Sequence, residues 1–276
     1  MLTFDLRTPD LAFEFVLNML NMTGRDFTQE YFVNCNHDFE ELWRKNYHHL
    51  KTIHADEIKI MAFHITASLD DCESIKENGI HNLQEVLSCD SIMNQMLSKY
   101  GVQINIDECT LVYKGRVYNI DYADYKGRFN LHGIDKHLSS ISYRIYYDFT
   151  VNGFLCCDNV FSYGTNIHLR PEFILDLVNA FPDLQIMQEE WINLSNSYRI
   201  DYFAYVDQLH RFNFSLDEYR DPPCEEWDQL NDNDKIVKWM LFHAIDRAYD
   251  ELGQTYLYLK DDLSVPPEQI ISCQKL

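Results

Sequence analysis

Apolar residues recur every three or four positions in several stretches of the chain, which is the spacing of an amphipathic helix. The first such stretch opens at Pro9 and is expected to end at Gly24. Asp38, three residues before Glu41, predicts a capping box at the start of a second helix. Further helices are predicted after Asp70 or Asp71 as far as Gly79, over 83–100 with a break near Asp90, after Gly133, from Pro171 to Phe181, and over 235–250.

Other stretches have the composition of β-strands. Residues 58–65 are almost continuously apolar, which predicts a strand that is covered on both faces. Residues 110–121 predict a β-hairpin with its turn at Lys114 and Gly115. Extended segments are also predicted at 153–161, 198–206 and 255–259, with a final strand after Pro267.

The order of these elements predicts an α+β fold. A helical N-terminal part, residues 1–55, precedes a domain over 56–276 with a mixed or antiparallel sheet at its core. Residues of about 83–149 are expected to form a largely helical insertion in that domain. The chain has 276 residues, 46% of them hydrophobic, so it is long enough to bury a sizeable core.

The formal net charge of −21 restricts the partners that the chain is expected to bind. Such a surface repels phosphate backbones, which argues against a general grip on nucleic acid. Residues 217–234 hold eight acids and one arginine and predict an acidic surface loop. The charge therefore favours either plain solubility or an acidic interaction or inhibitor protein, which would bind a basic partner or mimic nucleic acid.

The eight cysteines include no Cys-x-x-Cys pair, and none has partners at zinc spacing. We therefore expect reduced thiols and no bound metal. The N-terminal residues lack a basic region followed by an apolar run, so neither a secretory signal nor a transmembrane helix is expected. Together these features predict a cytoplasmic protein without a membrane partner. The sequence leaves the oligomeric state open.

A pair of polar residues stands at the end of the strand predicted at 58–65. His64 and Thr66 are two positions apart, so their side chains share one face of the strand. A neutral histidine both donates and accepts a hydrogen bond, which suits a ribose hydroxyl or an amide. The alternative is a histidine that is bonded within its own sheet. A short helix then follows and ends at Gly79.

A second polar group precedes the helix that is predicted to begin at Pro171. Tyr163 and Thr165 end an extended segment there, and His168 and Arg170 follow. An aromatic plane suits a flat, cationic ring such as nicotinamide. Arg170 is a candidate phosphate contact. A glycine turn that leads into a capped helix explains the same residues equally well.

These two groups, in this order, resemble the motifs of diphtheria-toxin-like and DarT-like ADP-ribosyltransferases. That family has His-x-Thr followed by an Ile-x-x-x-Gly-Ile/Leu helix end, and then Tyr-x-Thr or Tyr-x-Ser before a helix. The resemblance implies that His64 and Thr66 bind the adenosine side of NAD and that Tyr163 stacks on nicotinamide, with Thr165 beside it. It covers residues of about 56–80, 154–182 and 250–273.

The family also requires a glutamate that holds the nicotinamide ribose and stabilises the positive charge of the transition state. Glu251, just ahead of the extended segment at 255–259, is the candidate in this chain, and Glu189 and Glu190 are its rivals. No Glu-x-Glu or Gln-x-Glu stands where the family has one. The resemblance implies transfer of ADP-ribose to a macromolecule, protein rather than nucleic acid given the charge, and a role as a toxin or in phage–host conflict.

Overall fold

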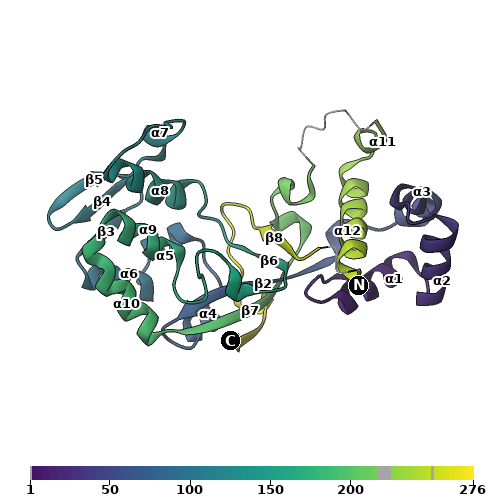
Figure 1. Cartoon of the computed structure of the whole chain (residues 1–276), viewed down its shortest axis with the longest axis horizontal. Helices are drawn as coiled ribbons and strands as arrows, with labels where there is room; N and C mark the ends of the chain where they lie inside the picture. Colours follow the sequence, from purple (N-terminus) through teal and green to yellow (C-terminus); the bar gives the residue numbers. More distant parts are fainter. Residues whose placement is uncertain (1, 217–224, 250–251) are drawn as a thin grey trace. The chain divides into compact units, whose positions relative to one another are not determined.

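The computed structural model describes residues 2–216, 225–249 and 252–276, which form two compact units (Figure 1). The first unit comprises the described residues of Met1–Phe63, Asn152–Asp158 and Asp201–Tyr258. The second comprises His64–Val151, Asn159–Ile200 and Leu259–Leu276. Each unit contains both helices and strands.

One six-stranded sheet has the strand order β8-β6-β2-β7-β9, and β1 pairs with β2 in parallel. The strands are β1 (Thr3–Phe4), β2 (Lys59–Ser68), β6 (Asn152–Cys157), β7 (Asn196–Ala204), β8 (Gln254–Tyr258) and β9 (Ile270–Lys275). Strand β2 pairs antiparallel with β6, and β6 pairs antiparallel with β8. The strand predicted at 58–65 is confirmed, and its consecutive buried residues show that both faces are covered.

The helices of the first unit are α1 (Pro9–Leu20), α2 (Gly24–Thr28), the π-helix η1 (Gln29–Asn34), α3 (Phe39–Leu50), α11 (Glu225–Asp228) and α12 (Asp232–Ala248). Three 3-10 turns accompany them: η2 (Ala55–Glu57), η5 (Val206–Gln208) and η6 (Arg211–Phe214). Helix α1 packs against α12. The prediction that the first helix ends at Gly24 is wrong, because Asn21 already takes the left-handed conformation and Gly24 begins α2.

The second helix that the sequence predicts is α3, and it begins where it was predicted to begin. The Asp38 side chain accepts a hydrogen bond from the Glu41 backbone N–H and so caps α3. Further along, strand β6 requires a glycine at position 153. A Cβ atom there would lie 2.5 Å from the Tyr202 hydroxyl and 2.8 Å from the Phe63 carbonyl oxygen. The fully buried Tyr202 ring therefore occupies the space that any other side chain would need.

The helices of the second unit are α4 (Glu73–Asn78), α5 (Leu83–Ser88), α6 (Ile92–Lys99), α7 (Tyr122–Tyr125), α8 (Ile134–Tyr146), α9 (Glu172–Ala180) and α10 (Gln185–Leu194). Short 3-10 turns lie at η3 (Val160–Ser162), η4 (Pro182–Leu184) and η7 (Pro267–Gln269). The predicted break near Asp90 is confirmed, because α5 and α6 are separate helices. Residues 83–149 thus contain four of these helices, and they also contain a sheet.

That sheet has three antiparallel strands, β3 (Val102–Asn105), β4 (Thr110–Tyr113) and β5 (Arg116–Asn119). The predicted hairpin is confirmed, and Lys114 and Gly115 in its turn both have positive φ, at 50° and 72°. Strand β3 was not predicted, because four residues are too few to show an alternating pattern. The α+β class is therefore confirmed with antiparallel sheets, while an ADP-ribosyltransferase core stays a prediction.

The core of the second unit lies between α8, α9 and their neighbours. Leu138, Ile141 and Ile145 form the buried face that was predicted for the helix after Gly133. They belong to the same hydrophobic cluster as Phe173 of α9. No helix in the described ranges combines the length and the apolar character that are needed to span a bilayer.

Candidate functional site

His64 and Thr66 lie on one face of β2, as their spacing predicts, and both are half-buried. The strand continues to Ser68, whose Oγ accepts a hydrogen bond from the Cys72 backbone N–H at 2.8 Å. Asp70 Oδ2 accepts from the Ser74 N–H, also at 2.8 Å. These bonds turn the chain from the end of β2 into α4. The N-cap of α4 is Cys72 and neither Asp70 nor Asp71, but the Asp70 side chain still bonds the first turn of the helix.

Helix α4 ends at Gly79, as predicted. Gly79 has a φ of 93°, and a Cβ atom there would lie 2.1 Å from the Val265 carbonyl oxygen. Ile80 and Val265 form an antiparallel bridge with two backbone hydrogen bonds of 2.9 Å. The glycine is therefore required both by its backbone conformation and by the close approach of the segment before β9.

The loop from Tyr163 to Arg170 carries the second predicted group. Arg170 is only 8% exposed. Its Nε donates to Gln188 Oε1 at 2.6 Å, and its Nη1 donates to the Thr165 carbonyl oxygen at 2.7 Å. Arg170 thus ties the loop to α10. Its predicted role as a phosphate contact stays a prediction.

Two buried polar atoms of this loop have no hydrogen-bond partner. They are Thr165 Oγ1 and His168 Nδ1. Burial lowers the pKa of His168, which favours the neutral ring. Buried polar groups are nearly always hydrogen-bonded, so these two atoms are exceptions within the described chain. Tyr163, at the start of the loop, is half-buried.

Two of the three candidates for the catalytic acid lie in the described chain. Glu251 lies outside the described residues. Glu189 and Glu190 lie on α10, not at a strand end. Glu190 Oε2 accepts a hydrogen bond of 2.6 Å from the Tyr100 hydroxyl, and Lys99 bonds its other oxygen. Hydrogen bonds from Lys99 and Tyr100 lower the pKa of Glu190, so this carboxylate joins α10 to α6.

A cavity in the second unit was missed by the sequence analysis. It has a volume of about 400 Å³ and is lined by residues of α7, the loop after it, α8 and α9. Its walls include three tyrosines and three cations, which are Tyr122, Tyr125, Tyr143, Lys126, Arg128 and Arg144. The only signal in the sequence is the closeness of Lys126 and Arg128 to two tyrosines, and that pattern equally describes a solvated loop.

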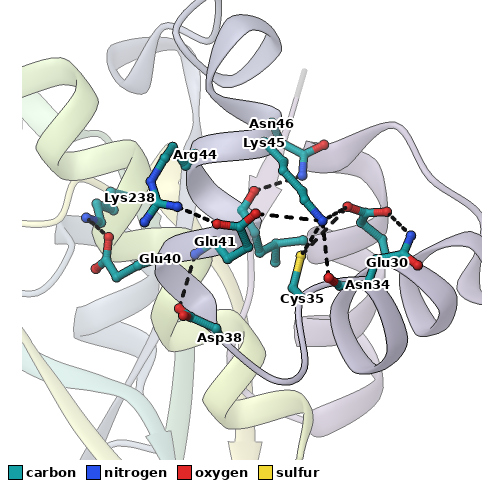
Figure 2. A network of polar contacts seen from close by, with 11 residues as sticks. Glu30, Asn34, Cys35, Asp38, Glu40, Glu41, Arg44, Lys45, Asn46 and Lys238 are labelled. Carbon is teal, nitrogen blue, oxygen red and sulfur yellow. Dashed lines mark hydrogen bonds and ion pairs between the residues drawn. The ribbon is translucent and has the colours of Figure 1, made fainter.

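The first unit contains a polar network around α3 and η1 (Figure 2). Lys45 Nζ lies 3.3 Å from Glu30 Oε1 and 3.6 Å from Cys35 Sγ. Burial raises the pKa of the Cys35 thiol, although the nearby Lys45 charge opposes this effect. A buried thiol with a raised pKa is a poor nucleophile. This network therefore joins α3 to η1.

No protein-family model, no curated protein and no solved structure matches the chain. Within residues 2–216, 225–249 and 252–276, no three His, Cys, Asp or Glu side chains gather as the ligands of a metal ion would. The two polar segments of the second unit and the cavity are accordingly the places at which a function can be proposed.

Proposed function

We propose that the chain is an NAD-dependent ADP-ribosyltransferase-like protein whose NAD site is formed by His64 and Thr66 of β2 and by the loop that holds Tyr163 and Thr165. The observation that carries this proposal is the buried Thr165 hydroxyl without a partner. An unsatisfied hydroxyl is costly in a folded protein unless a ligand bonds it. Thr165 is also the position that the sequence pattern indicated for a ligand contact.

In this proposal each residue has a role that its chemistry allows. His64 hydrogen-bonds the adenosine side of NAD, and Tyr163 stacks on the nicotinamide ring. Arg170 positions the loop, because its guanidinium already holds the Thr165 carbonyl. Glu251 is the proposed acid that stabilises positive charge at the ribose. The acceptor is a macromolecule, and the net charge of −21 favours a protein over a nucleic acid.

Calorimetric titration with NAD tests the proposal most directly. Wild type is expected to bind NAD, and Tyr163→Ala and His64→Ala are expected to lose that binding. Absence of binding by wild type at millimolar NAD, or binding that both variants retain, would contradict it. The acidic interaction or inhibitor protein stays the alternative prediction. Its acidic surface loop is wrong in part, because Glu225–Asp228 form α11 and α12 begins at Asp232, with Asp234 buried. Residues 217–224 lie outside the described residues.

Thr165→Val sharpens the test, because it removes the hydroxyl and keeps the shape of the side chain. It is expected to weaken NAD binding about tenfold and to raise the free energy of unfolding by about 1 kcal/mol. Thr8→Val is the matched control, because the Thr8 hydroxyl caps α1. The control is expected to lower stability by about 1 kcal/mol and to leave NAD binding unchanged.

A further inference from the structure

The cavity in the second unit is open to solvent and has the size of a small-molecule site. Its volume is about 400 Å³, and ligand pockets commonly hold roughly 300–1,000 Å³. Its walls come from α7, the loop after α7, α8 and α9. All these elements belong to one compact unit. The residues of the proposed NAD site are not among those that line it.

Two of the three cations in the wall are available to an anion. Lys126 and Arg128 are exposed, and neither makes an ion pair with any described residue. Gly127 between them has a φ of 78° and open space around it. In a chain with a net charge of −21, these two cations, separated by one residue, give the loop after α7 a local positive charge. Both residues line the cavity, so they place positive charge at its edge.

The third cation is committed to the protein itself. Arg144 Nη1 lies 2.5 Å from Asp148 and 3.1 Å from Glu172, and its Nε lies 3.4 Å from Asp176. Burial raises the pKa of Asp176, while Arg144 opposes this effect. Asp176 also lines the cavity. This wall therefore offers a hydrogen-bond acceptor for a hydroxyl or amino group and would repel a phosphate.

Aromatic rings supply the remaining surface. Tyr143 is 40% exposed, and its ring centroid lies 6.0 Å from that of Tyr122 in an edge-to-face arrangement. Tyr125 is held in place because its hydroxyl donates a hydrogen bond of 2.9 Å to the Asn119 carbonyl. Tyrosine faces stack on planar rings such as nucleobases, with about 1–3 kcal/mol per base. The lining of the cavity thus combines two exposed cations, the Asp176 carboxylate and tyrosine rings.

We propose that this cavity binds a nucleoside monophosphate, with its phosphate on Lys126 and Arg128, its base against Tyr143 and Tyr122, and its ribose or base donors toward Asp176. Each part of this ligand matches one part of the wall. Ser139 and Ser140 add hydroxyls to the same lining. The site is separate from the proposed NAD site and does not depend on the transferase proposal.

The test is calorimetric titration of the full chain with adenosine monophosphate, adenosine and inorganic phosphate as probes. Wild type is expected to bind the monophosphate about tenfold more tightly than either of the other two. Lys126→Gln with Arg128→Gln is expected to weaken the binding of adenosine monophosphate about tenfold or more. Tyr143→Leu is expected to weaken it by a similar factor, because the leucine offers no aromatic face.

A matched double variant controls for charge. Arg116 and Lys136 are a second exposed pair in residues 83–149 without ion pairs to described residues, and neither lines the cavity. Arg116→Gln with Lys136→Gln is expected to leave the affinity within about twofold. An equal loss in this control would overturn the proposal, because binding would then depend on net charge alone.

Three other results would also overturn it. One is the absence of binding to wild type at millimolar adenosine monophosphate. Another is equal affinity for phosphate and for adenosine monophosphate, which would remove the role of the rings. The last is binding that Tyr163→Ala abolishes and the Lys126/Arg128 variant retains, because this would place the nucleotide in the proposed NAD site. Binding that persists in Tyr163→Ala and is lost in the Lys126/Arg128 variant supports the cavity.

Discussion

The polar network around α3 and the cavity beside α8 contain similar residues but use them differently. In the network every cation has a carboxylate partner from the same unit: Arg44 pairs with Glu41, Lys45 with Glu30, and Lys238 with Glu40 (Figure 2). In the cavity Arg144 is paired, while Lys126 and Arg128 pair with no described residue. The two regions therefore differ in whether their cations have carboxylate partners in the described chain.

Arg144→Met should produce the largest effect, because it removes the one paired cation of the cavity. Arg144 is 22% exposed at its side chain and faces three carboxylates. Without it, two of these, Asp148 and Asp176, are left partly buried and charged. We expect the free energy of unfolding to fall by about 3 kcal/mol at neutral pH, as measured by urea denaturation.

The pH dependence of that loss has a definite sign. Burial raises the pKa of both Asp148 and Asp176 in the folded protein. A carboxyl with a raised folded pKa favours the folded state at low pH, and this contribution is lost as the pH rises from the usual value of about 4 through the raised one. The deficit of Arg144→Met should therefore shrink as the pH falls toward about 4. A deficit that is constant over this range would contradict the assigned ion pairs.

Lys238→Ala tests a cation of the network and should have an intermediate effect. Its side chain is 6% exposed, and its ammonium lies 2.6 Å from Glu40 and 5.7 Å from the centre of the Trp43 ring. Glu40 is 48% exposed, so solvent screens the ion pair and most of the loss comes from packing and from the ring contact. We expect thermal and urea unfolding to show a loss of about 2 kcal/mol.

The control for that variant is Lys136→Ala, an exposed lysine on α8 without an ion pair to any described residue. It should change stability by less than about 0.5 kcal/mol. If Lys238→Ala lowers the free energy of unfolding as little as Lys136→Ala does, the paired cations of the network do not stabilise the fold. The network and the unpaired cations of the cavity would then not differ in their effect on stability.

The smallest effect on stability is expected for the Lys126→Gln and Arg128→Gln double variant. Both side chains are exposed and contact no carboxylate of the described chain, so unfolding by urea should change by less than about 0.5 kcal/mol. The same variant is expected to lose nucleotide binding. A large loss of stability would instead assign these residues a structural role and remove the difference between the two regions.

Local signals in the sequence predicted local structure well. The cap at Asp38, the apolar strand that became β2, the hairpin turn at Lys114 and Gly115, and the helix end at Gly79 each depend on residues within a few positions of one another. The end of α1 was missed, because asparagine signals a left-handed cap less strongly than glycine does.

Contacts between residues that are far apart in the sequence could not be predicted from local patterns. The cavity combines Lys126, Tyr143 and Asp176, which are brought together only by the packing of α7, α8 and α9. The sequence indicated Arg170 as a candidate ligand contact. The residues around it in the sequence do not show that its Nε donates a hydrogen bond to Gln188, which lies 18 positions further along the chain. Thr165 was a candidate from its pattern alone, but its lack of a hydrogen-bond partner is visible only in the folded chain.

The division of the two units along the chain limits how the protein can be dissected. Six segments alternate between the units, so the chain crosses from one to the other five times, twice within a strand, after Phe63 in β2 and after Ile200 in β7. No single cut leaves both units whole, because a cut after Phe63 divides the first unit and a cut after Tyr258 divides the second. A chain that is cut at any one point therefore loses segments of at least one unit, and functional work must use the intact polypeptide or point substitutions.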